Sequence, residues 1–429
     1  MSRTFDNRHF LFLQGPHGPF FGQLGGLLTH AGARVWRAGF NFGDRMFWPD
    51  RATFLPCHAS KAQWPQTIRD TLIEKSITDL VLYGDTRPIH AEAIRAAKTL
   101  GITIHVFEEG YMRPWWITYE RGGSNGHSRL MALDMAAITK ALQPETTPPP
   151  EAPAHWGDLR QHMFWGAVYH GLVLAGGRRF PAFRPHRSRT AAQEFVLHLR
   201  RLLLLPLHRW DRLLATRRIR RGAFPYHLAL LQLEHDASFR AHSTYRRMTD
   251  FLADVITSFA AAAPPHHHLV FKAHPLEDGR TPLAPDIRRL ARAAGIAARV
   301  HFVRGGKLAG LLDHAVSAVT VNSTAGQQAL WRGLPLKIMG SAVYGKPGLV
   351  SDQTLAEFFA SPSRPDMPAC RNFRRFLLAT SQIPGSYYSS RGRQAGLRRM
   401  ADLMLGEDDP YAALLPEGEA SRQQLRLAT

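Results

Sequence analysis

Short apolar segments alternate along this chain with longer segments whose apolar residues recur every three or four positions. The short segments predict buried strands, and the longer ones predict helices that bury one face. In the first part of the chain we expect strands at 10–14, 35–40, 79–83 and 102–107, and helices at about 24–32 and 89–100. Strands that are separated by helices indicate a parallel sheet covered on both faces.

The same alternation returns after Pro225. Here the expected strands are at 228–233, 268–272, 300–303, 318–321 and 334–339, and the expected helices at about 239–262 and 325–331. The two regions predict an α/β protein with two Rossmann-like domains that face a cleft. A Pro-rich break and a basic segment separate the two regions. We therefore expect domains at 1–150 and 225–400, a basic helical insertion at 151–224 and a tail at 401–429.

Composition is typical of a two-domain cytoplasmic enzyme. The chain has 429 residues, more than one hydrophobic core usually holds, with 45% hydrophobic and 21% charged residues. Cys57 and Cys370 are the only cysteines, which argues against a disulfide scaffold. We expect no secretory signal, because residues 1–7 lack a basic region followed by an apolar one, and no membrane-spanning helix, because the chain has no apolar run of about 18 residues. Metal-binding motifs do not occur, so we expect neither a metal nor another cofactor.

The net charge of +20 predicts a negatively charged partner. Much of this charge lies in the insertion, where Arg200, Arg201, Arg217 and Arg218 accompany leucine-rich segments and Trp210. Basic residues among leucines and a tryptophan are typical of a helix that lies on an anionic membrane. The same segment could instead pack on the protein itself. We expect no nucleic-acid partner, because no motif that reads nucleic acid is recognisable.

Pairs of reactive side chains follow two of the expected strands. Glu108 and Glu109 immediately follow the first region's last strand, where repulsion between adjacent carboxylates would favour the protonated form of one and so provide an acid or base. Lys272 and His274, just before Pro275, lie on one face of an extended segment and could both contact a phosphate. An exposed loop pair and a structural histidine are the ordinary alternatives.

A third motif places hydroxyl groups at the start of an expected helix. Ser323 and Thr324 lie between Asn322 and Gly326, where their hydroxyls and the N–H groups of the helix could bind an anion. An ordinary N-cap explains the same residues. Gly15, in the turn after the first strand, could admit a ligand close to the backbone or simply turn the chain.

The motifs as a set resemble those of known families. Glu108-Glu109-Gly110, His274-Pro275 and Ser323-Thr324 resemble the motifs of bacterial sialyltransferases, which use CMP-activated sugars. A longer set, from about residue 10 to about residue 345, is similar to the capsule polysaccharide biosynthesis and export family of the KpsS type. This set is Gln14-Gly-Pro-His-Gly-Pro-Phe-Phe, Phe42-Gly-Asp-Arg-Met-Phe-Trp, Tyr83-Gly-Asp-Thr-Arg-Pro-Ile-His, Phe107-Glu-Glu-Gly-Tyr, Leu231-Gln-Leu-Glu-His-Asp and Asn322-Ser-Thr-Ala-Gly.

The resemblance implies a GT-B-like, retaining β-Kdo glycosyltransferase. Members of this type transfer Kdo from CMP-β-Kdo to a lysophosphatidylglycerol acceptor at the cytoplasmic face of the inner membrane. This step starts the linker of a Gram-negative capsule, which a KpsC-type transferase then extends. The resemblance therefore implies five partners: the CMP-Kdo donor, the lipid acceptor, the anionic inner-membrane surface, the KpsC-type transferase and the capsule exporter.

The resemblance also implies roles for individual residues. Asp236 would be the nucleophile of a double displacement and Glu109 its acid or base, although Asp236 equally fits a structural role. Lys272 and His274 would hold the CMP phosphate, with Ser323 and Thr324 at its other oxygens. The remaining donor-side candidates are Pro275, Asn322 and Gly326, and the second choices are Glu108, Asp44, Arg45, Asp85, Arg87 and Gly15.

Arg87 suits the Kdo carboxylate, because a planar guanidinium binds a carboxylate through two hydrogen bonds. Two other functions stay open at this point. One is a different sugar-nucleotide enzyme, such as an epimerase or a transferase with another CMP-sugar. The other is a noncatalytic scaffold of a capsule assembly and export complex.

Overall fold

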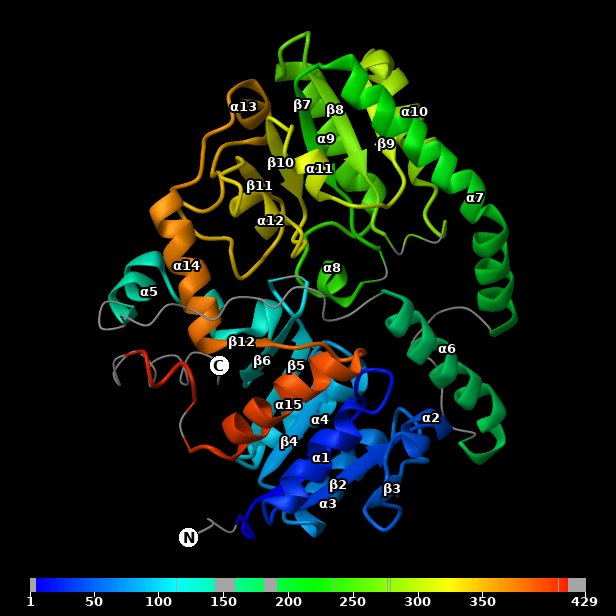
Figure 1. Ribbon diagram of the computed structural model, residues 1–429, viewed down its shortest axis with the longest axis vertical. Coiled ribbons are helices and arrows are strands. Elements are labelled where there is room, and N and C mark those ends of the chain that lie inside the picture. The colour runs from blue at the N-terminus through cyan, green and yellow to red at the C-terminus, as the bar shows by residue number, and fades with distance from the viewer. Residues whose placement is uncertain are drawn as a thin grey trace. The chain divides into compact units, whose positions relative to one another are not determined.

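The computed structural model describes residues 5–112, 114–142, 159–180, 191–234, 236–275, 277, 279–407 and 409–415. These residues form two compact units (Figure 1). Unit 1 takes in the described residues of 1–133, 140–185 and 374–429, and unit 2 those of 134–139 and 186–373. Each unit is built around its own sheet, so the predicted α/β class is confirmed. The predicted cleft concerns the placement of the two domains and stays a prediction.

The sheet of unit 1 has seven strands in the order β12-β6-β5-β4-β1-β2-β3. The strands β1 to β5 are parallel, whereas β6 runs antiparallel to β5 and β12 antiparallel to β6. The strands are β1 (His9–Phe12), β2 (Arg34–Gly39), β3 (Phe54–Pro56), β4 (Asp79–Tyr83), β5 (Thr103–Glu109), β6 (Trp116–Arg121) and β12 (Gln382–Pro384). The sequence analysis placed four of these strands and missed β3, β6 and β12.

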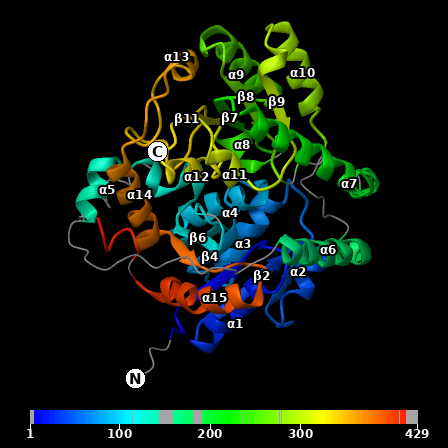
Figure 2. The ribbon, with the colours of Figure 1, turned by 45° about the horizontal axis from the view of Figure 1, so that its top comes forward.

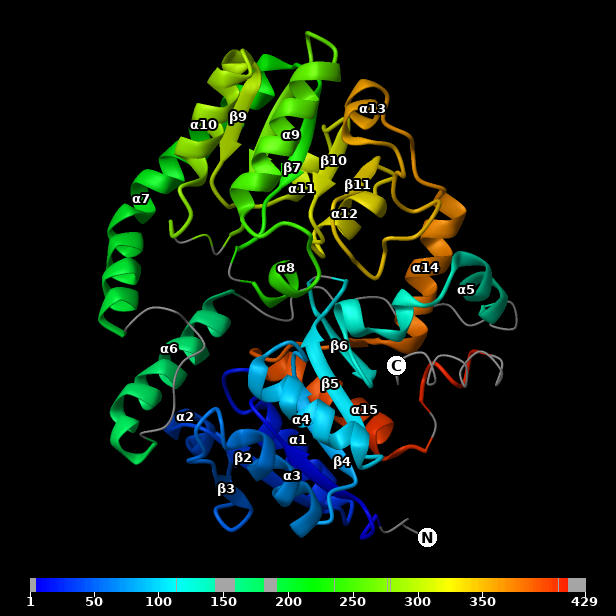
Figure 3. The ribbon, with the colours of Figure 1, turned by 180° about the vertical axis from the view of Figure 1, so that it is seen from behind.

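Alternating side chains of β1 show how this sheet is covered. Phe10 and Phe12 join a core with α1 (Phe20–His30) and α15 (Ser390–Leu405), which lie on one face (Figure 1). Leu11 points to the other face and joins a core with α3 (Trp64–Glu74) and α4 (Pro88–Thr99), which Figure 3 shows from behind. Because side chains of a strand point alternately to the two faces, this apolar strand is buried on both sides.

Further helices complete unit 1. They are α2 (Phe42–Met46), α6 (Leu159–Ala175), and the 3-10 helices η1 (Asn125–His127), η2 (Arg129–Met131) and η3 (Gly177–Arg179). Two further helices, α5 (Met135–Ala141) and α14 (Met367–Thr380), run across the division between the units.

The C-terminal segment corrects the predicted domain ranges. The range 225–400 was expected to form one domain, but its last part belongs to unit 1. Ile383 of β12 is buried beside Ile117 of β6, and Met400 of α15 is buried in the core that contains Phe10. These apolar contacts cover the antiparallel edge and one face of the sheet. Because they join residues that are far apart in the sequence, no local pattern predicts them. The predicted insertion is likewise divided, with α6 in unit 1 and α7 (Ala191–Gly222) in unit 2, and the predicted boundary at 150 lies outside the described residues.

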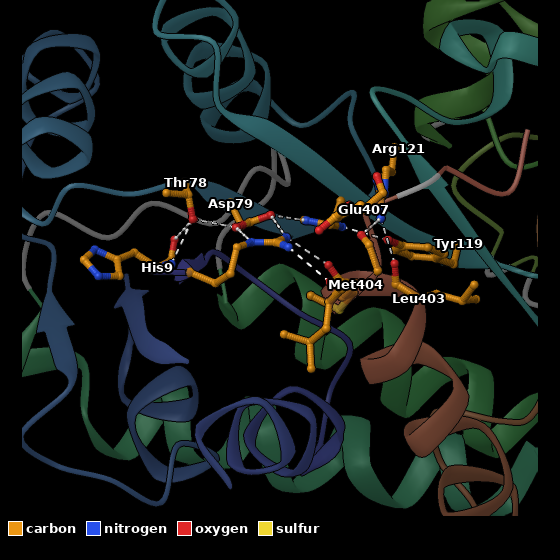
Figure 4. Close-up of polar contacts among 12 residues, drawn as sticks. His9, Thr78, Asp79, Tyr119, Arg121, Leu403, Met404 and Glu407 are labelled. Carbon is orange, nitrogen blue, oxygen red and sulfur yellow. Dashed lines mark hydrogen bonds and ion pairs between the residues drawn. The ribbon is translucent and has the colours of Figure 1, made fainter. Parts of the chain in front are cut away.

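Two arginines hold the carboxyl end of α15 (Figure 4). Arg8 donates to the carbonyl oxygen of Met404 at 2.9 Å, and Arg121 donates to that of Leu403 at 2.8 Å. Cations are favourable here because the last carbonyl groups of a helix lack partners and carry the negative end of its dipole. The contacts fasten the C-terminal helix to the sheet.

A buried polar chain lies beside these arginines. Asp79 accepts hydrogen bonds from Arg8 and from His105 Nε2, the latter at 2.7 Å. Burial acts to raise the pKa of Asp79, but these bonds outweigh it and hold that pKa well below its usual range. Burial lowers the pKa of His105, so the neutral ring donates to Asp79 and accepts from Tyr119 Oη at 2.8 Å. Asp79 begins β4, so this chain lies at the amino end of the sheet and stabilises the fold.

Unit 2 contains a parallel five-stranded sheet in the order β11-β10-β7-β8-β9. Its helices α9 and α10 lie side by side (Figure 2) and share a core with the strands. The strands are β7 (Tyr226–Leu230), β8 (His268–Lys272), β9 (Val300–Val303), β10 (Ser317–Thr320) and β11 (Leu336–Ile338). The helices besides α7 are α8 (Ala237–Ala241), α9 (Met248–Ala262), α10 (Leu283–Ala293), η4 (Ala297–Arg299), α11 (Ala309–Leu312), α12 (Gly326–Leu330) and α13 (Leu355–Ala360).

One predicted helix of unit 2 is interrupted. The segment 239–262 was expected to be continuous, but α8 ends at Ala241 and α9 begins at Met248. Between them Ser243 forms an isolated bridge with Gly340, and Glu234 accepts a hydrogen bond from the backbone N–H of Met248 at 2.9 Å. Both contacts come from outside the predicted helix, which explains why its periodicity alone did not show the break.

Candidate active site

The acidic motif of unit 1 lies at the carboxyl edge of its sheet. Tyr83 ends β4 and Glu109 ends the neighbouring strand β5. The Tyr83 hydroxyl donates a hydrogen bond to Glu109 Oε1 at 3.1 Å. Burial and the nearby charge of Glu109 raise the pKa of Tyr83 well above its usual value, so the phenol keeps its proton and remains a donor. Carboxyl edges of parallel sheets are where such proteins bind ligands.

Further side chains surround this pair. The Arg87 guanidinium lies over the Tyr83 ring, 5.6 Å from its centre. Tyr388 is hydrogen-bonded to Tyr83, and burial together with the charge of Glu109 raises the pKa of Tyr388 above its usual value. Glu108 Oε1 accepts a hydrogen bond from the Glu109 N–H at 3.0 Å. Glu109, Arg87 and Glu108 are therefore brought together as the sequence suggested, whereas Tyr83 and Tyr388 were missed as site residues.

Asp44, one of the second-choice carboxylates, forms hydrogen bonds that stabilise the fold. It is buried and accepts hydrogen bonds from the Phe40 N–H at 3.0 Å, from Arg37 at 3.1 Å and from the Tyr169 hydroxyl at 3.0 Å. Its neighbour Arg45 lies over the ring of Phe54, 5.1 Å from its centre. These contacts favour a structural role for both residues.

Asp85 has a similar environment. It is buried and accepts from the Ser124 N–H at 2.8 Å and from His127 Nδ1 at 3.1 Å. The hydrogen bond to Asp85 raises the pKa of His127. Asp85 thus joins the loop after β4 to the segment after β6, which supports the edge where Glu109 lies.

The turn after β1 carries Gly15 and a residue that the sequence analysis did not single out. A Cβ atom at Gly15 would lie 2.4 Å from the ring of Phe21, so close packing against α1 accounts for this glycine. The side chain of the preceding Gln14 is buried, and its Oε1 has no hydrogen-bond partner among the described residues. A buried amide oxygen of this kind is a candidate ligand contact. The sequence feature that could have indicated Gln14 is its place as the first residue of the motif Gln14-Gly-Pro-His-Gly-Pro-Phe-Phe.

Lys272 ends β8 at the carboxyl edge of unit 2. Its side chain is buried, and its ammonium donates to the carbonyl oxygen of Ala273 at 3.1 Å. Burial, with a contribution from the positive charge of Arg212, lowers the pKa of Lys272 to about 8. His274 is half-buried and Pro275 is exposed in the loop that follows. A buried cation at a strand end suits an anionic ligand.

The loops after β7 and β10 are joined by an amide pair. Gln232 donates to Asn322 Oδ1 at 2.8 Å, and the Asn322 N–H donates to Gln232 Oε1 at 3.0 Å. The backbone N–H of Leu231 also donates to the Lys272 carbonyl oxygen at 3.0 Å. Because β7 pairs with both β8 and β10, the motifs of Lys272 and Asn322 lie on the two strands that flank β7. Gln232 was missed as the link between them.

The hydroxyl motif differs from the expected anion site. The N–H of Ala325 donates to Ser323 Oγ at 3.2 Å, and that of Gly326 donates to the Ser323 carbonyl oxygen at 2.9 Å. The N–H of Gln327 donates to the Thr324 carbonyl oxygen at 3.2 Å. The expectation that free N–H groups of this helix would receive an anion is therefore wrong, because these N–H groups donate hydrogen bonds within a tight turn. Ser323 and Thr324 remain partly exposed.

Gly326 and Gln327, which follow the hydroxyl motif, are both buried. Gly326 packs against the Tyr344 ring, since a Cβ atom there would lie 2.6 Å from the Tyr344 hydroxyl. Gln327 is buried, and both its amide nitrogen and its amide oxygen have no partner among the described residues. Leaving such an amide unpaired costs about 1–3 kcal/mol, which makes Gln327 a candidate ligand contact that the sequence analysis missed.

Asp236, the predicted nucleophile, lies in the loop between β7 and α8 and is exposed. Its N–H donates to the Leu233 carbonyl oxygen at 2.9 Å, and its own carbonyl oxygen accepts from the Arg240 N–H at 3.1 Å. The strand before it ends at Leu230, three residues earlier than expected. Asp236 therefore shares the carboxyl edge of unit 2 with Lys272 and Asn322.

The part of the chain that the structure describes has no cluster of three His, Cys, Asp or Glu side chains that could bind a metal ion. In the same part, no helix combines the length and the apolar character that crossing a bilayer requires.

The basic helix α7 has two different faces. Arg212 packs against Gly306, and Arg304 forms an ion pair with Asp211 at 2.9 Å, so one face lies on unit 2. Trp210 and Arg217 are exposed on the other side. Arg218 is exposed nearer the packed face, where burial lowers the pKa of His301 in β9 and the charge of Arg218 adds to that effect. Of the predicted membrane residues, Arg200 and Arg201 lie in α7, but their side chains are outside the described part. Packing and an exposed basic surface thus coexist in one helix.

Comparison with known proteins identifies the family. The model of the family "Capsule polysaccharide biosynthesis protein" matches residues 78–388. This chain belongs to that family. The capsule polysaccharide export protein KpsS of Escherichia coli is 33% identical over 384 residues, which cover 89% of this chain and 97% of the relative. The capsule polysaccharide modification protein LipB of Neisseria meningitidis serogroup B is 31% identical over 388 residues, which cover 89% of this chain and 92% of LipB.

The resemblance to the capsule biosynthesis family that the motifs indicated is thereby confirmed. Among solved structures, the β-Kdo 2,7 transferase KpsC of Thermosulfurimonas dismutans aligns with 93% of this chain and 99% of its own, at 12% identity and a TM-score of 0.44.

Proposed function

We propose that this capsule biosynthesis protein is a retaining glycosyltransferase. It moves Kdo from CMP-β-Kdo to a lysophosphatidylglycerol and so starts the β-Kdo linker of a Gram-negative capsule. Family membership and the sequence motifs support the reaction class. The observation that carries the proposal is Glu109, a carboxylate at the carboxyl edge of unit 1 that accepts a hydrogen bond from the protonated Tyr83.

The first step of the proposed reaction takes place on the donor. The Asp236 carboxylate attacks the anomeric carbon of Kdo, the bond from that carbon to the phosphate oxygen breaks, and CMP leaves. Lys272 and His274 stabilise the charge that develops on the departing phosphate. Gln327 supplies a buried amide that a ligand could satisfy.

The second step transfers the sugar. Glu109 takes the proton of the acceptor hydroxyl, the hydroxyl oxygen attacks the same anomeric carbon, and the Asp236 carboxylate is released. Each displacement inverts the anomeric carbon, so two displacements retain its configuration. Arg87, near Glu109, is suited to the Kdo carboxylate.

The acceptor requires a membrane surface. We assign this contact to exposed residues of α7, among them Trp210, Arg217 and Arg218, so that the enzyme binds peripherally at the cytoplasmic face of the inner membrane. A KpsC-type transferase and the capsule exporter are the expected partners for the product.

The test is a reaction of the purified full-length protein with CMP-Kdo and a fluorescent lysophosphatidylglycerol, followed by mass measurement of the lipid. We expect a Kdo-lipid product and released CMP. Glu109→Gln should abolish the product, whereas the exposed control Glu74→Gln should not. CMP release without a lipid product would point to another sugar-nucleotide enzyme, and neither product would point to a noncatalytic scaffold.

A further inference from the structure

Helix α6 carries an exposed apolar face in unit 1. Met163, Phe164 and Leu174 are 57%, 59% and 69% exposed, and Ala167 between them is exposed too. These positions recur at helical spacing, so they lie on one side of the helix. Among the described residues, eleven large apolar side chains are strongly exposed, and α6 and α7 hold seven of them. Such a concentration marks an interaction surface.

The opposite face of α6 is firmly held. Trp165 packs over Gly18, where a Cβ atom would lie 3.1 Å from the indole, and its Nε1 donates to the Tyr388 carbonyl oxygen at 3.1 Å. Tyr169 donates to Asp44 and stacks on His17 at 4.4 Å between ring centres. The helix therefore lies on the loops that follow β1 and β2 at the carboxyl edge of the sheet.

Among the described residues 159–180, every Asp, Glu, Lys or Arg side chain is a positive one. Arg160 lies on the same side of the helix, and Arg178 and Arg179 follow its last turn; all three are exposed. No aspartate or glutamate occurs between residues 159 and 180. An apolar face with basic residues at its ends complements a bilayer that contains anionic lipid, since the apolar side chains enter the interface and the arginines meet the headgroups.

We infer that α6 is a second lipid-binding helix, separate from α7, and that anionic bilayer is the occupant of its exposed face. The inference rests on the proposed function and deepens it. It places the lipid surface, which holds the acceptor, against α6, and α6 packs on the carboxyl edge of unit 1 where Glu109 lies. Binding of α6 to lipid does not itself depend on Kdo transfer.

The decisive measurement is a fluorescent probe on α6. The exposed Ala167 is replaced by cysteine in a Cys57→Ser background and labelled with an environment-sensitive fluorophore; Cys370 is buried and should not react. Adding vesicles of phosphatidylglycerol and phosphatidylcholine should raise and blue-shift the emission, and lipids that carry a nitroxide should quench it. The same label at Ile73, an exposed residue of α3, should show neither change.

A triple variant tests the energetic contribution. Met163→Gln, Phe164→Gln and Leu174→Gln together should weaken binding to these vesicles by about tenfold or more. The matched control is Leu27→Gln, Ile73→Gln and Met131→Gln, which are exposed apolar residues elsewhere in unit 1 and should leave binding unchanged.

Three results would overturn the inference. The first is a probe at residue 167 that does not respond to phosphatidylglycerol vesicles. The second is an equal response to purely zwitterionic vesicles. The third is a triple variant that binds vesicles normally but no longer self-associates or binds a protein partner. Because no CMP-Kdo is present, a failure here is distinguishable from a failure of the proposed transferase reaction, which the product assay reports.

Discussion

The hydroxyl of Tyr83 donates a hydrogen bond to Glu109 Oε1 at 3.1 Å, from the last residue of one strand to the last residue of its neighbour. A donor in this position orients the carboxylate that takes the proton of the acceptor hydroxyl in the proposed reaction. The relationship gives Tyr83 a positioning role in the proposed reaction.

Tyr83→Phe should reduce turnover by about ten- to a hundredfold, because a hydrogen bond to a charged group contributes about 1.5–3 kcal/mol. The loss should fall on kcat and leave KM for CMP-Kdo nearly unchanged, since the hydroxyl orients the base and has no assigned contact with the donor. The matched control is Tyr245→Phe, which removes a similar hydrogen bond to Asp254 in unit 2. An unchanged kcat in Tyr83→Phe, or a loss confined to KM, would exclude the positioning role.

Lys272 should give the donor site its own pH dependence. Its pKa is lowered to about 8 because the side chain is buried. The free enzyme therefore carries the ammonium below about pH 8 and loses it above, so kcat/KM for CMP-Kdo should fall as the pH rises through that value. Lys272→Met should be poorly active at every pH, and the exposed control Lys307→Met should follow the wild-type profile. A flat wild-type profile between pH 7 and about pH 9 would contradict this role.

The double displacement predicts a covalent intermediate on Asp236. Glu109→Gln removes the base of the second step, so this variant should accumulate a Kdo adduct when it is incubated with CMP-Kdo without an acceptor. Peptide mass mapping should find the sugar on Asp236. An adduct on Asp44, Asp85 or Glu108 would keep the mechanism and move the nucleophile.

The variant Asp236→Ala provides the complementary measurement. If Asp236 is the nucleophile, it should transfer no Kdo, while the exposed control Asp254→Ala should remain active. Full wild-type activity in Asp236→Ala would remove this residue from the chemistry.

Exposed arginines of α7 should contribute to membrane binding through charge. Arg217→Gln with Arg218→Gln should weaken binding to phosphatidylglycerol vesicles, because each basic residue near an anionic surface contributes about 1 kcal/mol. Raised salt should have the same effect on the wild type. The matched control is Arg246→Gln with Arg247→Gln, an exposed pair elsewhere in unit 2. Equal losses in both double variants would assign the effect to net charge alone.

Glu120 on β6 should make stability depend on pH. It is buried and accepts hydrogen bonds from the hydroxyls of Tyr111 at 2.6 Å, Tyr411 at 3.0 Å and Ser128. Burial raises its pKa to about 7, against a usual 4.5, despite these bonds. The folded protein thus holds a proton that the unfolded chain releases between these two values, and folding loses up to about 3 kcal/mol as the pH rises through this range.

Glu120→Gln cannot release that proton, so its stability should change less between pH 4.5 and pH 7 than that of the wild type. Denaturant unfolding at several pH values measures the difference. The exposed control Glu74→Gln should follow the wild type. Parallel stability curves for Glu120→Gln and the wild type would show that Glu120 is ionised in the folded protein.

The sequence by itself determined the α/β class, most of the parallel strands and the motifs at their carboxyl ends. Those features are local: an apolar segment such as 79–83 can be buried only as a strand between helices, and the residues that follow it must lie at the sheet edge. The same logic placed Glu109, Lys272 and Asn322 correctly at strand ends.

Tertiary structure decided the rest. Asp44, Asp85 and Asp236 have the same side chain. Only the hydrogen bonds of Asp44 and Asp85 with buried groups show that these two carboxylates stabilise the fold. Tyr83 meets Glu109 because β4 and β5 pair, although 26 residues separate them. The last segment joins unit 1 because β12 and α15 cover apolar surface left exposed by the antiparallel edge and one face of the first sheet. Such contacts depend on which surfaces meet across the chain, and short-range periodicity carries no information about them.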